Sequence, residues 1–166
     1  GLIDHADSLG AAARYGNGDV QWLTAGNGIQ HAEMFPLFDK VNTNSIDFFQ
    51  IWVNLPASRK RVKPYFSMFW ADQVPVINIQ DSNGRMTEIT VIAGQNGKKK
   101  PPNPPPDSWA SDSNNNFAMW IIKLQSNAEW ILPATSSTTN RSLYIVNGKG
   151  IKIGKQLINS RNQVEI

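Results

Sequence analysis

The sequence predicts an all-β protein, and three features of the 166-residue chain support this prediction. Short apolar runs rich in Val, Ile, Phe and Trp alternate with Gly, Asn and Pro turn residues. Asn83-Gly84, between two such runs, is a strong signal for a β-hairpin turn. No long stretch shows the 3.6-residue periodicity of an amphipathic helix. We therefore expect short antiparallel strands that close into small barrels or sandwiches.

Eight strands are expected between the turn signals. They lie near residues 19–25, 28–35, 46–55, 74–80, 86–93, 117–125, 128–133 and 142–147, and extended segments continue from residue 150. The run 45–56 is apolar at both odd and even positions, which is typical of a strand buried on both faces. Residues 66–70 are expected to form one helical turn.

A connector divides the chain. Five prolines and three lysines lie within GQNGKKKPPNPPPDSW, residues 94–109. Prolines cannot join a central strand ladder, so this segment is expected to be a rigid, solvated spacer. We expect one module at 1–95, the connector at 96–112 and a second module at 113–166.

Composition excludes several classes of function. The chain has no cysteine, which excludes disulfides and thiolate sites and favours a reducing, cytoplasmic location. No apolar run is long enough to span a membrane. The net charge of +3 is too small to indicate nucleic-acid binding. The basic run 59–63 is interpreted as a solvated loop.

His31 and Glu33 are the candidate metal ligands. Residues i and i+2 of a strand point to the same face, so this imidazole and this carboxylate look into one space. With no soft ligand present, iron, manganese, nickel or zinc suits such a pair. A surface strand with two polar side chains shows the same spacing, and such a strand is the commoner case.

His5 and Asp7 repeat the same spacing. Two interpretations remain open: a polar rim that supports the ligands, and a solvated strand end. The short context favours the solvated strand end.

Three segments in this order and spacing resemble the pirin family of the cupin superfamily. They are HADSLG (5–10), GNGDVQWLTAGNGIQHAEM (16–34) and FQIWVNLPA (49–57). Asn17 stands where the family pattern usually has proline. PPPDSWA (104–110) and NRSLYIVNGKG (140–150) resemble the start of the second barrel of bacterial pirin-like proteins.

The resemblance implies a bicupin, two cupin-type jelly-roll barrels, with Fe(II) in the first barrel. In the family three histidines and one glutamate hold the iron, and His31 and Glu33 match the downstream two of these ligands. The other two ligands belong to a His-x-His segment that lies upstream of the family segment with which this chain begins. We therefore expect a chain truncated at both ends: the second half of the N-terminal barrel in 1–95 and the first part of the C-terminal barrel in 113–166.

Two functions follow from the resemblance. The first is an iron-dependent, quercetin-type dioxygenase with a flavonol-like aromatic substrate, active only when the upstream histidines are present. The alternative is a non-catalytic regulatory module that binds a protein partner. With only two ligands the ion should be held weakly or not at all, and replacing His5 should leave most metal binding intact. Unpaired sheet edges should favour a strand-exchanged homo-oligomer.

Overall fold

The computed structural model describes residues 1–160 and 162–166. Within these ranges the chain forms twelve short strands and three single-turn 3-10 helices, and no α-helix is present. The prediction of an all-β fold is confirmed.

The strands are β1 (Leu2–Asp7), β2 (Ala12–Gly16), β3 (Val20–Thr24), β4 (His31–Met34), β5 (Tyr65–Phe69), β6 (Val76–Gln80), β7 (Met86–Ala93), β8 (Met119–Leu124), β9 (Ser142–Tyr144), β10 (Gly150–Ile153), β11 (Gln156–Asn159) and β12 (Gln163–Glu165). The 3-10 helices are η1 (Ala57–Arg59), η2 (Trp109–Ser111) and η3 (Ser113–Asn115).

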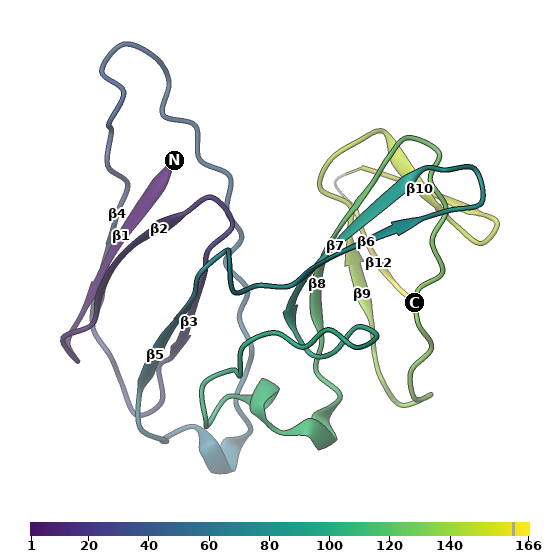
Figure 1. Ribbon diagram of the computed structural model, residues 1–166. Helices are drawn as coiled ribbons and strands as arrows, with labels where there is room; N and C mark the ends of the chain where they lie inside the picture. Colours follow the sequence, from purple (N-terminus) through teal and green to yellow (C-terminus); the bar gives the residue numbers. More distant parts are fainter. Residues whose placement is uncertain (161) are drawn as a thin grey trace. The chain divides into compact units, whose positions relative to one another are not determined.

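The chain divides into two compact units, Gly1–Trp130 and Ile131–Ile166. The first unit contains three antiparallel sheets, with strand orders β2-β1-β4, β3-β5 and β6-β7-β8 (Figure 1). The second unit contains two antiparallel pairs, β9 with β12 and β10 with β11. The candidate site lies entirely in the first unit.

An apolar cluster in the first unit joins the β3-β5 pair to the ends of β7 and β8. Phe69, Val74 and Ile92 are buried there, and Val20, Trp22 and Met119 pack against them. Removal of this apolar surface from water is the main force that holds these strands together.

Three of the predicted elements are wrong. Residues 46–55 form no strand, and Phe48 and Trp52 are 48% and 88% exposed. A strand needs a neighbouring backbone to satisfy its N–H and C=O groups, and the described part of the chain offers this segment no ladder partner. Residues 128–133 are likewise irregular, with Ile131 89% exposed.

The third wrong prediction concerns residues 66–70. Four of these residues belong to β5, which pairs with β3 from Tyr65 opposite Thr24 to Phe69 opposite Val20. Pairing with a distant strand has overridden the weak local preference for a helical turn.

The boundary between the two compact units differs from the expected barrel boundary. β8 follows the proline-rich connector in sequence but pairs with β7, which precedes it. The three-stranded sheet β6-β7-β8 is therefore formed by segments from both sides of residues 96–112. The compact units are defined by contacts between segments, and they do not test which residues belong to which cupin barrel. The assignment of 1–95 and 113–166 to two barrels therefore stays a prediction.

Candidate metal centre

The register between β1 and β4 gathers four polar side chains on one face of the sheet. The strands are antiparallel, with His5 opposite Glu33 and Asp7 opposite His31. Because alternate residues of a strand share a face, all four side chains lie on the same side. Two His-x-acid segments, distant in sequence, thus form one cluster.

Hydrogen bonds fix the ends of both strands beside this cluster. The Asp7 carboxylate accepts hydrogen bonds from the backbone N–H groups of Leu9 and Ala11, at 2.8 and 3.1 Å. The turn that follows is tied to the start of β4, since the Ser8 N–H donates to the Gln30 carbonyl at 2.8 Å. The Gln30 N–H in turn donates to the Ser8 hydroxyl at 3.1 Å. These contacts hold β4 in register with β1.

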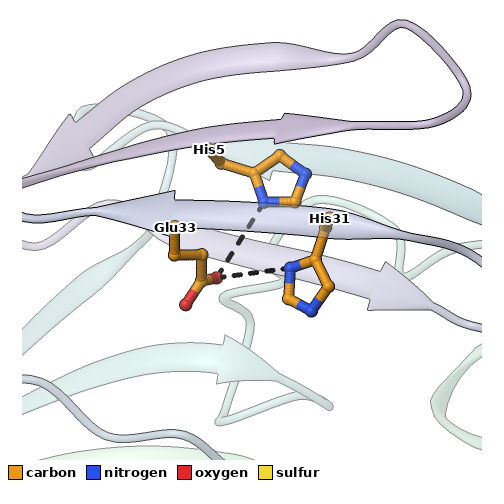
Figure 2. A group of neighbouring side chains, drawn as sticks. All are labelled: His5, His31 and Glu33. Atoms are coloured by element: carbon orange, nitrogen blue, oxygen red, sulfur yellow. Dashed lines mark ion pairs between the residues drawn. The ribbon is translucent and has the colours of Figure 1, made fainter.

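Three of the four residues converge on one point (Figure 2). Glu33 Oε1 lies 3.9 Å from His5 Nδ1 and 4.0 Å from His31 Nδ1. One ligand atom from each residue lies within 4.8 Å of the others. Two imidazoles and a carboxylate are a donor set that suits iron(II), manganese, nickel or zinc. The residues present therefore fit a divalent transition-metal ion.

His5 is buried, at 2% exposure, so its interpretation as a solvated strand end is wrong. Its Nε2 lies 3.2 Å from Asp7 Oδ2, and both side chains are completely enclosed. The ring also stacks on Phe66 of β5, with 4.7 Å between ring centroids. The signal that could have found this position is the repeated His-x-acid spacing, but spacing does not tell which strands pair.

The Asp7 carboxylate remains charged despite its enclosure. Burial acts to raise its pKa, while hydrogen bonds from the His5 ring and from the Leu9 and Ala11 N–H groups outweigh this and hold the pKa below its ordinary value of 3.8. Asp7 is therefore an ionised acceptor at neutral pH.

Two further residues surround Glu33, and neither was predicted as part of a site. The Gln21 side-chain amide on β3 donates to Glu33 Oε1 at 3.4 Å. Burial, followed by the neighbouring charge of Glu33 and a hydrogen bond to it, raises the pKa of Tyr15 on β2 to about 12. Tyr15 thus keeps its proton. These contacts depend on strand pairing and leave no signal in local sequence.

His31 forms the open side of the cluster. Its side chain is 36% exposed, in contrast to the enclosed His5. A shallow depression beside it is lined by Ala6, Asp7, Ser8, Gln30, His31 and Ala32. A ligand from solution can approach the cluster from this side.

Comparison with known proteins bears out the resemblance to the pirin family. The pirin family model matches residues 1–53. The resemblance to pirins is confirmed. The matched segment contains all four cluster residues, from His5 to Glu33.

Curated relatives support the same resemblance. The chain is 33% identical over 125 residues to a Pseudomonas aeruginosa protein provisionally named as a quercetin 2,3-dioxygenase; the match covers 75% of this chain and 40% of the relative. It is 36% identical over 95 residues to human pirin, covering 57% of this chain and 29% of pirin. The chain thus spans less than half the length of these relatives.

A solved structure supports the cupin-type fold. A quercetin 2,3-dioxygenase from Acinetobacter baumannii superimposes with a TM-score of 0.57 at 21% identity. The superposition covers 99% of this chain and 53% of that protein. In addition, none of the helices in the described ranges has the length and apolar character needed to cross a membrane.

Proposed function

We propose that this chain forms the metal-binding part of a pirin-like, iron-dependent oxygenase that acts on a flavonol-type aromatic compound. The observation that carries the proposal is the convergence of imidazole and carboxylate atoms around Glu33 Oε1, with neighbouring ligand atoms at 3.9 and 4.0 Å. The names of the Pseudomonas and Acinetobacter relatives supply the reaction class.

His31 and Glu33 hold the ion in this proposal. When bound, the metal supplies the redox-active centre for reaction of a flavonol with dioxygen. Gln21 and Tyr15 restrain the Glu33 carboxylate, because each directs a hydrogen-bond donor toward it. The exposed side of His31 leaves room for an aromatic substrate to approach.

The test is an assay of quercetin consumption by the full-length product. The protein is loaded with Fe(II) under exclusion of air, and oxygen is then admitted. We expect loss of quercetin absorbance, matched by oxygen uptake. A Glu33→Gln variant should lose both, because it removes a charged ligand without changing side-chain size. An iron-loaded protein that leaves quercetin and oxygen unchanged would contradict the oxygenase proposal.

The alternative, a regulatory module that binds a protein partner, is favoured by a different observation. Phe48, Phe49, Ile51 and Trp52 are all exposed in one apolar stretch between β4 and β5. Contiguous exposed apolar surface often marks an interaction site. A protein that lacks activity with iron bound, yet loses a partner when Trp52 is replaced by Ser, would favour this alternative.

Two wider expectations accompany the proposal. A scaffold of two cupin barrels would place the present site in the first barrel, as the resemblance to pirins implies. The absence of cysteine suits a cytoplasmic protein. Imaging of a tagged full-length product would test the location.

A further inference from the structure

We propose that His5 is a third ligand of this metal site, that it coordinates through Nδ1, and that Asp7 is the positioning residue that keeps Nδ1 free for the ion. This inference rests on the proposed metal site at His31 and Glu33. It replaces the expectation that His5 contributes little to metal binding.

Asp7 determines which ring nitrogen of His5 carries the proton. The Asp7 carboxylate already accepts the backbone N–H groups of Leu9 and Ala11, so the geometry assigns the His5 Nε2 at 3.2 Å as a further donor to it and hence as the protonated nitrogen. In a neutral imidazole Nδ1 then presents a lone pair. A carboxylate that binds the far nitrogen of a ligating histidine is a recurrent arrangement at metal sites, where it fixes ring orientation and raises ligand basicity.

His5 Nδ1 lacks a partner of its own. It is a buried nitrogen with no hydrogen-bond partner among the described residues. The nearest charged atom is Glu33 Oε1 at 3.9 Å, which is also an acceptor (Figure 2). A buried polar atom without a partner is costly, so the enclosed Nδ1 that faces a partly exposed carboxylate oxygen points to a cation between them.

The two separations from Glu33 suit a shared ion. Ligand atoms that each lie about 2.1 Å from a metal stand about 3.0 Å apart at a right angle and about 4.2 Å apart in line. The separation of 3.9 Å from Glu33 to His5 and that of 4.0 Å from Glu33 to His31 both fall within this range. The centroids of the two histidine rings are 5.5 Å apart, so both rings can face the same ion.

The competing explanation is a doubly protonated His5 that bridges Asp7 and Glu33 without any metal. In that case Nδ1 donates to Glu33 and binds no ion. The two explanations assign opposite roles to the same nitrogen atom, and nitrogen NMR separates them.

The experiment is 15N NMR of the imidazole rings in the whole 166-residue chain, titrated with Zn²⁺ as a diamagnetic probe. The chain has only two histidines, so a His31→Gln variant assigns both sets of signals. We expect His5 Nδ1 to shift on saturation with zinc while His5 Nε2 keeps its proton, and we expect a nitrogen of His31 to shift at the same zinc concentration.

Two results would overturn the inference. A shift confined to His31 would show that zinc binds without His5, which refutes the inference and leaves the proposed metal site standing. No shift at either ring would refute the metal site itself and this inference with it.

Substitutions separate coordination from structural support. The His5→Gln variant can keep a donor near Asp7 but has no atom at the Nδ1 position. It should therefore weaken zinc binding by more than Asp7→Asn does. Asp7→Asn should weaken it by about 10- to 100-fold, as is usual when a partner of a ligating histidine is changed. Asp4→Asn is the matched control, because Asp4 pairs with Arg14 on the opposite face of β1.

Zinc affinity in the His5→Gln variant equal to that of the parent would overturn the inference. If this variant does not fold, the ring-nitrogen shifts of the parent protein still decide the matter.

Discussion

Gly26 is the residue that allows the chain to turn between β3 and β4. It adopts a φ of +53°, and a Cβ built on it would lie 2.1 Å from the backbone carbonyl oxygen of Val62. That carbonyl accepts a hydrogen bond from the Asn27 N–H at 2.9 Å, so it cannot move away freely. We predict that Gly26→Ala lowers the free energy of unfolding by more than about 2 kcal/mol, measured by chemical denaturation.

The matched control is Gly97→Ala. Gly97 has a φ of +57°, and nothing lies within 4 Å of its added Cβ. It should therefore show only the backbone cost of about 1–2 kcal/mol. Equal losses in the two variants would show that the contact with Val62 is unimportant.

At the residue scale, sequence reasoning could place His31 and Glu33 together but not the remainder of the cluster. The i, i+2 rule is local and needs only a strand, and the two side chains do share a face of β4. The approach of His5 depends on the register between β1 and β4, which involves residues 24 or more positions apart. No local pattern encodes that register.

At the element scale, β7 is the most deeply buried strand. Ile89 and Val91 have no exposed surface, and β7 lies between β6 and β8. We predict that Ile89→Ala lowers the free energy of unfolding by about 2–5 kcal/mol, because it removes buried methyl groups and leaves a cavity. Val76→Ala on the neighbouring β6 is the control: Val76 is exposed, so its loss should be about 0.5 kcal/mol or less. Similar losses would contradict the assigned burial.

The turn between β6 and β7 should make stability depend on acid pH. The Asp81 carboxylate accepts hydrogen bonds from the N–H groups of Arg85, Asn83 and Glu129. These bonds, that from Arg85 foremost, hold the pKa of Asp81 below its ordinary value of 3.8. A lowered carboxyl pKa contributes stability that is present above pH 3.8 and is lost as pH falls through the folded-state pKa.

We therefore predict that Asp81→Asn is less stable than the parent at pH 6 and that the difference shrinks steadily below pH 3.8. Urea unfolding across this range measures it. A difference that is independent of pH would show that the Asp81 charge does not contribute.

The segment 45–56 shows where element prediction fails. Its apolar pattern predicted burial on both faces, but burial in a sheet also requires a partner strand, and the large apolar side chains of this segment are exposed. The strand 86–93 was predicted with the bounds that β7 has, because its turn and its partner lie beside it in sequence. For a local hairpin the sequence predicts the strands and their pairing together, whereas for 45–56 the apolar pattern carries no information on whether a partner strand exists.

At the scale of the whole molecule, the sheets have many open edges. Each of the five sheets in the described ranges has only two or three strands, so most strands have a neighbour on one side only. Open edges recruit strands from other chains. We predict that the 166-residue chain forms a strand-exchanged dimer or larger species, measured by multi-angle light scattering over a range of concentrations. A monomer at every concentration would contradict this prediction.

The central claim is that β1 and β4 together form a site for a divalent metal ion, with His31 and Glu33 among its ligands. The most direct test is equilibrium dialysis of the parent and of a His31→Ala variant against the same zinc solution, followed by elemental analysis. Circular dichroism of both proteins checks that the fold is retained. We predict that the parent retains zinc at concentrations at which the variant does not, because loss of a ligand lowers affinity. Equal zinc content in the two proteins would contradict the claim.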